Sequence, residues 1–178
     1  MESKPDDKLI DFLQNQVLAI ETLWEAKLQI PTLILLYATL DIVAFIRTGG
    51  SDRQADARFR DFVGHYIVKH LRGITKDDIW GARSAILHTA APESSSSINL
   101  QAKEILYSWG TASRAELLNQ VLAQAPEPHK YVVMSVEDLM AALENGINEF
   151  IEDLDKDPDL YKVCMERAGK FYADMPAQ

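Results

Sequence analysis

Cysteine, glycine and proline are scarce in this sequence of 178 residues. The single cysteine, Cys164, excludes both an intramolecular disulfide and a cysteine-rich zinc site, and it fits a reducing, cytoplasmic compartment. With only 8 glycines and 7 prolines beside 47% hydrophobic residues, the composition is that of a globular protein rather than a disordered one. The length suits one domain, residues 1–178, with a substantial core.

Several motifs that mark targeting, cofactor and metal sites are also missing. Segment 1–7 is polar and acidic and lacks the form of a signal peptide. Gly49-Gly50 alone has the form of a turn, so the chain has no glycine-rich phosphate loop. His65 and His70 do not have the i, i+4 spacing that chelates a metal on a helix, and no acid–histidine cluster surrounds them. We therefore expect no metal and no cofactor.

Long hydrophobic runs are limited to one segment, from Ile30 to Ile46, which only the charge of Asp41 interrupts. This run is shorter than the roughly 20 residues that a membrane-spanning helix needs. A helix that is apolar on all sides is usually the central helix of a bundle. The segment therefore predicts a buried central helix rather than a membrane anchor.

The net charge of −9 is unevenly distributed along the chain. Residues 1–46 hold 3 basic and 7 acidic side chains, whereas residues 47–88 hold 8 basic and 5 acidic ones. Residues 116–178 are strongly acidic, with 5 basic and 13 acidic side chains. A globally acidic protein is a poor non-specific binder of nucleic acid, but a local basic face can still admit a chosen RNA.

Hydrophobic periodicity, capping residues and turn residues predict a mainly α protein, a helical bundle with a possible small two-stranded β ribbon. The β-rich segment 131–134 is expected to pair with 104–109, and segment 89–98, with its serine run, is expected to be a loop. The helical phase of the long acidic helix continues through Asn145-Gly146, so this dipeptide is expected inside the helix. The expected helices cover 8–29, 31–47, 52–70, 76–88, 113–123, 135–154 and 157–171.

The most informative motif is Arg83-Ser84-Ala85-Ile86-Leu87-His88, in the helix expected over 76–88. Thr75 and Asp78 have the spacing of a capping box that would begin this helix. Arginine is always charged and grips phosphate with a planar fork, and histidine exchanges protons near neutral pH. The two side chains together are suited to chemistry on a phosphodiester.

The Arg83–His88 spacing resembles the R-x4-6-H signature of the HEPN superfamily, the all-helical domains of many prokaryotic RNase toxins and their relatives. In that family a small polar residue commonly follows the arginine, and Ser84 is compatible with this. The resemblance covers about residues 8–125 and leaves the C-terminal ribbon and two helices, about 126–178, without explanation.

The resemblance implies a metal-independent endoribonuclease, or an RNA-binding relative without activity, in a toxin–antitoxin or defence system. Arg83 and His88 would be catalytic and Ser84 would support them. Residues five apart on a helix differ by roughly 140° in direction, so one helix does not bring both side chains together. HEPN RNases meet this problem as homodimers, so the resemblance implies a two-fold dimer here, and it also allows for a protein partner such as an antitoxin.

Asp41 is a second candidate in the site. A carboxylate inside an apolar helix needs a partner, and Arg83 is the most attractive one, which would make Asp41 a supporting residue. Alternatively, Asp41 faces solvent or pairs with Arg47.

Four basic side chains, Arg58, His65, Lys69 and Arg72, recur along the polar side of the helix expected over 52–70 and just beyond it. They are candidates for an RNA-binding track, although such a stripe is also typical of a solvated face. The alternative function for the whole chain is a non-catalytic helical protein-interaction module that binds a partner through its acidic C-terminal helices.

Overall fold

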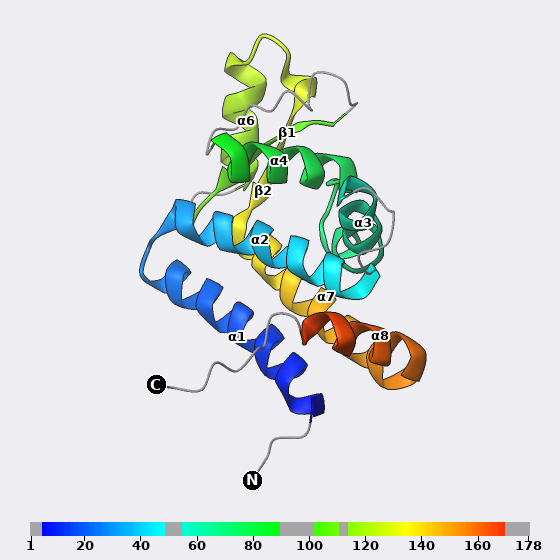
Figure 1. Ribbon diagram of the computed structural model, residues 1–178. Coiled ribbons are helices and arrows are strands. Elements are labelled where there is room, and N and C mark those ends of the chain that lie inside the picture. Colours follow the sequence, from blue (N-terminus) through cyan, green and yellow to red (C-terminus); the bar gives the residue numbers. More distant parts are fainter. Residues whose placement is uncertain (1–4, 49–54, 90–101, 111–113, 170–178) are drawn as a thin grey trace.

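A computed structural model of the protein describes residues 5–48, 55–89, 102–110 and 114–169 (Figure 1). These residues form a mainly α-helical fold with a small two-stranded sheet, which confirms the fold class predicted from the sequence. The loop predicted after His88 and its serine run lie almost wholly outside the described residues, as does Ser113, the expected cap of the short helix near 113–123.

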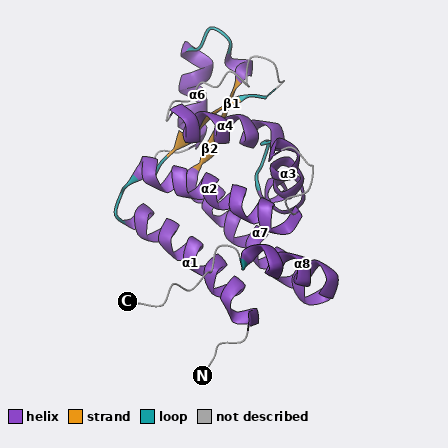
Figure 2. Cartoon of the chain, in the orientation of Figure 1, coloured by secondary structure: helices purple, strands orange, loops and turns teal. Residues whose placement is uncertain are grey.

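The elements follow one another along the chain as in Figure 2. The first half consists of helices α1 (Pro5–Glu25), α2 (Gln29–Thr48) and α3 (Ala55–Phe62), the π-helical turn η1 (Val63–Ile67), the 3-10 turn η2 (Val68–His70) and helix α4 (Lys76–Thr89). The second half consists of β1 (Glu104–Ser108), α6 (Arg114–Gln124), the 3-10 turn η3 (Pro128–Lys130), β2 (Tyr131–Ser135), α7 (Val136–Lys156) and α8 (Pro158–Ala168).

Helix α2 occupies the centre of the fold, as its apolar sequence predicted (Figure 1). It contacts α1, α3, α4, α7 and α8. By length and composition alone α2 also meets the criteria for a membrane span, but half of its most apolar window is buried inside the protein. Its contacts with five helices are those of a core helix. The side chains that it buries are Thr32, Leu33, Leu36, Tyr37, Thr39, Leu40, Val43, Ala44 and Ile46.

The corner between α1 and α2 differs from the sequence prediction, which extended the first helix to Gln29 and began the second at Pro31. Helix α1 ends at Glu25, and Lys27 adopts a left-handed conformation with φ of 60°. That conformation is unusual for a residue with a side chain, so sequence patterns do not signal it. Pro31 lies within the first turn of α2, where its missing N–H costs nothing.

The helix predicted over 52–70 is not one regular helix, because the α-helical hydrogen bonding of α3 gives way to the π-helical turn η1 and then to the 3-10 turn η2.

Gly146 lies inside α7, which confirms the prediction that the helix continues through it. At this glycine α7 passes very close to the irregular stretch η1. A Cβ atom on Gly146 would lie 2.6 Å from Ile67 Cδ1 and 2.9 Å from the carbonyl oxygen of Tyr66. The glycine is therefore required by close backbone approach rather than by a turn.

Strands β1 and β2 form a parallel pair in which Glu104 is opposite Tyr131 and Ser108 is opposite Ser135. Helix α6 and the turn η3 lie in the connection between them, as parallel pairing requires. Pairing of β1 with β2 therefore connects the part of the chain that the HEPN resemblance covers, up to about residue 125, with the part that follows it. One hydrophobic core cluster also contains residues from both parts, from Leu9 to Ala168.

We expect Gly146→Ala to lower the free energy of unfolding by about 1–3 kcal/mol, because the added methyl group must displace the backbone of Tyr66. Alanine is the better helix former by about 1 kcal/mol, so propensity alone predicts the opposite sign. Gly81→Ala in α4 is the matched control, since its Cβ would meet nothing closer than Ala102 Cβ at 3.8 Å. Urea denaturation of both variants measures the difference. Equal stability of the two would contradict the close approach.

Candidate functional site

The motif helix α4 begins at the capping box that the sequence predicted. Thr75 Oγ1 accepts a hydrogen bond from the Asp78 amide at 3.2 Å, and Asp78 Oδ2 accepts one from the Thr75 amide at 2.8 Å. Asp78 is 2% exposed, and its other oxygen accepts a hydrogen bond from the Lys103 amide at 2.6 Å. The first turn of α4 is therefore joined to the chain that enters β1, which fixes where the helix starts.

Arg83 lies two turns into α4 and is paired with Asp41 of α2. Its Nε donates to Asp41 Oδ2 at 2.9 Å, and its Nη2 donates to the same oxygen. The side chains are 16% and 27% exposed, so the pair is partly buried at the junction of the two helices. Of the three arrangements considered for Asp41, the structure has the pairing with Arg83, while Arg47 pairs with Asp61.

An aromatic ring also positions Arg83. Its Cζ lies 5.0 Å from the ring centroid of Trp80, one turn earlier on α4. Arg60 from α3 contacts the same ring at 5.7 Å, and its Nη1 lies 3.4 Å from Asp77. Such contacts are favourable because the ring face is electron-rich. Sequence reasoning missed Arg60, since only the packing of α3 on α4 brings it to Trp80.

His88 belongs to the last turn of α4, and its side chain lies outside the described part of the structure. Ser84 is half-buried, one turn before it. Because α4 is a regular helix, the backbone carries Arg83 and His88 on directions that differ by roughly 140°. Within one chain, α4 thus supplies an anchored arginine but does not bring the two motif residues onto one face.

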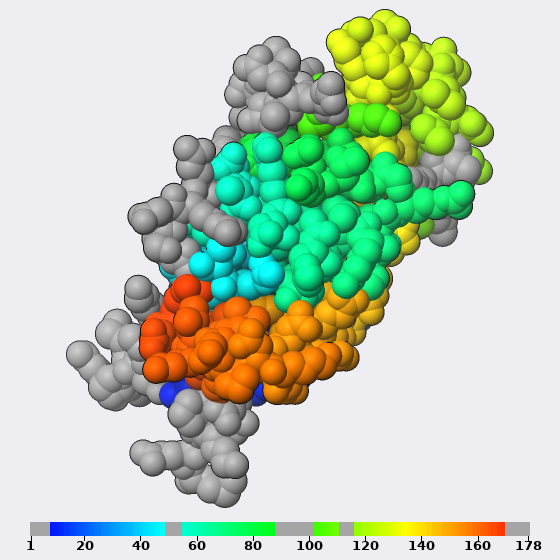
Figure 3. All heavy atoms as spheres, turned by 90° about the vertical axis from the view of Figure 1, so that its right-hand side faces the viewer, coloured from blue at the N-terminus to red at the C-terminus, as the bar shows by residue number. Residues whose placement is uncertain are grey.

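The candidate RNA track is partly neutralised by carboxylates of α7. Lys69 and His70 both bind Glu149, and His65 Nε2 lies 4.0 Å from Asp153. The hydrogen bond from Lys69, followed by that from His70, lowers the pKa of Glu149. Figure 3 shows why, since the teal and green surface of segment 55–89 borders the orange surface of α7 and α8.

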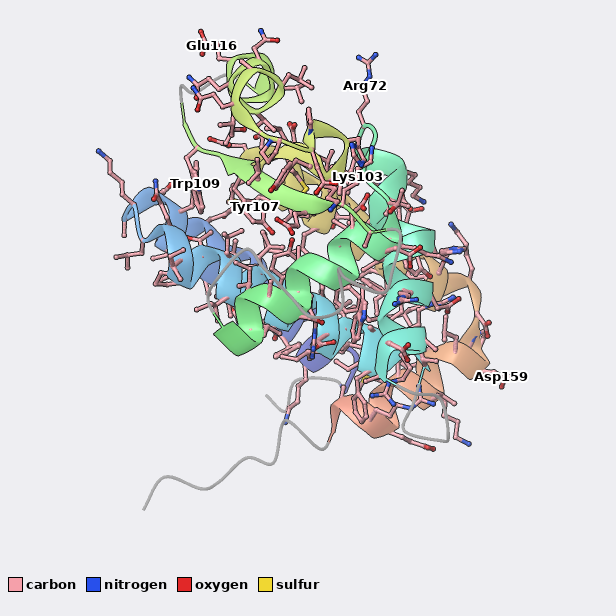
Figure 4. All side chains as sticks on the ribbon, turned by 90° about the horizontal axis from the view of Figure 1, so that it is seen from above. Arg72, Lys103, Tyr107, Trp109, Glu116 and Asp159 are labelled. Carbon is pink, nitrogen blue, oxygen red and sulfur yellow. The ribbon has the colours of Figure 1, made fainter. Side chains whose placement is uncertain are left out.

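The other two track residues lie apart from these pairs. The guanidinium of Arg58 is 5.6 Å from the ring centroid of Phe45, and Arg72 is exposed and points away from the body of the protein (Figure 4). The structure therefore does not gather the four residues into one stripe of uncompensated positive charge. The acidic partners from α7 had no signal in the sequence, because they come from a distant segment that packs on η1 and η2.

The buried hydroxyl groups of Tyr37 and Tyr107 and the buried thiol of Cys164 are poor nucleophiles. Tyr37 and Tyr107 share a hydrogen bond of 2.5 Å between α2 and β1, and burial raises the pKa of both well above the usual range (Figure 4). Trp109 stacks on Trp24 with ring centroids 5.4 Å apart, so it packs against the protein itself. Burial raises the pKa of Cys164 to about 11, which keeps the thiol protonated at neutral pH.

Within the described ranges, no group of three or more His, Cys, Asp or Glu side chains is placed to hold a metal ion. Comparison of the chain with models of protein families, with curated proteins and with solved structures finds no match.

We expect Asp41 and Arg83 to be energetically coupled. Asp41→Ala leaves the guanidinium partly buried without its acceptor, so it should destabilise the wild type by about 1–3 kcal/mol more than it destabilises an Arg83→Met background. Chemical denaturation of the four proteins completes the cycle. Asp61→Ala, which removes the partner of Arg47, is the control and should be additive with Arg83→Met. Equal losses from Asp41→Ala in both backgrounds would show that the pair is uncoupled.

Proposed function

We propose that the protein is a metal-independent endoribonuclease resembling HEPN proteins, in which Arg83 and His88 of α4 act on an RNA phosphodiester. The observation that carries the proposal is the anchoring of Arg83 by Asp41 and Trp80, on the helix that also carries His88. An arginine held in one conformation loses little entropy when it binds a phosphate, so anchoring improves both binding and catalysis.

The guanidinium of Arg83 has five N–H donors, more than one carboxylate oxygen can accept. Its Nε and Nη2 nitrogens both donate to Asp41 Oδ2. Arg60 contacts the same Trp80 ring but is paired with Asp77, so Arg83 is the group proposed to meet the phosphate. A guanidinium suits a phosphate that gains negative charge as the reaction proceeds.

The reaction assigned to the site needs one base and one acid. The base takes the proton of a ribose 2′-hydroxyl, whose oxygen then attacks the adjacent phosphorus. The bond from phosphorus to the 5′-oxygen breaks, and the acid protonates that oxygen. The products are a 2′,3′-cyclic phosphate and a 5′-hydroxyl. Imidazole suits either role, and one His88 at each site would take one of them while water takes the other.

Dimerisation is part of the proposal because of helix geometry. An angular offset of roughly 140° between Arg83 and His88 makes a poor site within one subunit. A two-fold axis beside α4 would let the arginine of one subunit and the histidine of its partner meet at one phosphate. Ser84, one turn before His88 on the same side of the helix, would then border the cleft.

Cleavage of RNA should persist in excess EDTA, since the mechanism uses no metal. An RNA whose ribose at the cleaved position is replaced by 2′-deoxyribose should remain intact, because the attacking hydroxyl is missing. Gel analysis of labelled RNA, with identification of a cyclic phosphate end, measures both expectations. Loss of activity in EDTA with recovery on adding Mg²⁺ would rule out this chemistry.

Arg83→Ala and His88→Ala should each reduce RNA cleavage by at least about 100-fold while helicity and dimerisation persist. When the two inactive proteins are mixed and allowed to exchange subunits, heterodimers contain one site with both groups intact and should regain part of the wild-type activity. Arg47→Ala, which removes the same charge from the last turn of α2 rather than from the motif helix, is the control. Monomeric protein in light scattering, or no recovery despite proven subunit exchange, would contradict the shared site.

A further inference from the structure

A groove runs between α1 and α7, two helices that are distant in sequence from the motif helix α4. It consists of two adjoining hollows of about 160 and 260 Å³ that share Val17, Glu21 and Glu144. From the larger hollow to the smaller one, the residue numbers on α1 increase while those on α7 decrease. The two helices therefore run antiparallel along the groove. Other residues that line it are Gln14, Leu18, Ile20, Glu137, Met140, Ala141, Leu143, Ile147, Asn148 and Ile151.

The floor of the groove is apolar. Ile20, Leu143 and Ile147 form part of the hydrophobic core and are almost fully buried. Leu18 lines the second hollow and is 59% exposed, so it adds water-accessible apolar surface to the groove. Contact with a further apolar surface would remove this side chain from water, with a gain of about 25 cal/mol for each Å² covered.

The edges of the groove are acidic. Glu21 of α1 and Glu144 of α7 line both hollows, and Glu137 lines the first. Glu137 accepts hydrogen bonds from the Gly110 amide and from the Ser135 hydroxyl. Among the described residues, no basic side chain forms an ion pair with Glu21 or Glu144. No lysine, arginine or histidine lines either hollow. An apolar floor between carboxylates is suited to a cationic amphipathic ligand.

The dimensions of the groove suit a helix. Its α7 side extends from Glu137 to Ile151, which spans roughly 21 Å at the rise of 1.5 Å per residue of an α-helix. A helix of about four turns has that length. Such a ligand would place apolar residues at i, i+3 or i+4 and i+7 on the floor and basic residues toward both edges.

We propose that the groove between α1 and α7 binds a basic amphipathic helix of another protein. The sign of the charge argues against other occupants. A second copy of this chain placed about a two-fold axis on the groove would bring Glu21 and Glu144 toward their own copies. Anionic lipid and RNA would meet the same carboxylates with like charge. This site and the α4 site have opposite electrostatic character and are independent of one another.

The test uses a synthetic amphipathic helix of eighteen leucine and lysine residues with a fluorescent label, and anisotropy measures its binding to the full chain. Glu21→Gln combined with Glu144→Gln should weaken binding at least tenfold. Asp155→Asn combined with Glu166→Gln is the control, because it removes the same charge from exposed positions outside the groove. Leu18→Gln, at an exposed position that leaves the core intact, should weaken binding at least threefold.

Circular dichroism and thermal unfolding establish that each variant is folded. A peptide of the same composition with its leucines scattered around the helix should bind at least tenfold more weakly. The proposal would be overturned if the Glu21/Glu144 double variant and the Asp155/Glu166 control weakened peptide binding equally. It would also be overturned if the two peptides bound equally well, or if neither bound. A change of oligomeric state in Leu18→Gln would overturn it in favour of a second copy. Arg83→Ala should leave peptide binding unchanged, so this result is separate from RNA cleavage.

Discussion

A long apolar helix needs neighbours along most of its length, and α2 imposes this requirement on the fold. Helices α1, α3, α4, α7 and α8 pack against α2, and only Ile30 and Ile34 near its start remain exposed among its large hydrophobic side chains. The single acidic residue of α2, Asp41, then lies at a helix junction where water reaches it only in part. A carboxylate in that position is stabilised by a cation. Arg83 supplies the cation, and the motif helix is thereby attached to the central helix through its motif arginine.

The long acidic helix α7 serves two surfaces of different character. One side contacts η1 and η2, where Glu149 and Asp153 balance the positive charge of Lys69, His70 and His65. Another side borders α1 and contributes carboxylates that no described cation balances. Charge compensation on the first side gives Lys69, His70 and His65 carboxylate partners. The carboxylates on the groove side have no such partner among the ion pairs of the described residues, so the two surfaces of α7 suit different ligands.

Local sequence patterns accounted for most of the secondary structure. The capping boxes and caps at Thr75, Ser135 and Asp157 begin helices, because each side chain satisfies amide groups within its own first turn. The left-handed Lys27 and the π-helical turn at Val63–Ile67 were not predictable in this way. Both depend on how separate helices fit together, and a lysine or a valine has no strong preference for either conformation.

The sequence by itself determined the mainly helical class, the central position of α2 and the motif on α4, because periodicity and capping act over one or two turns. It offered Arg83 as one candidate partner for Asp41 and left solvent and Arg47 open, and the packing of α4 on α2 decided for Arg83. Tertiary structure alone decided that Arg60 joins the Trp80 ring, that α7 neutralises part of the basic segment, and that α1 and α7 enclose an acidic groove. These features depend on contacts between residues distant in sequence, which only the packing of the helices brings together.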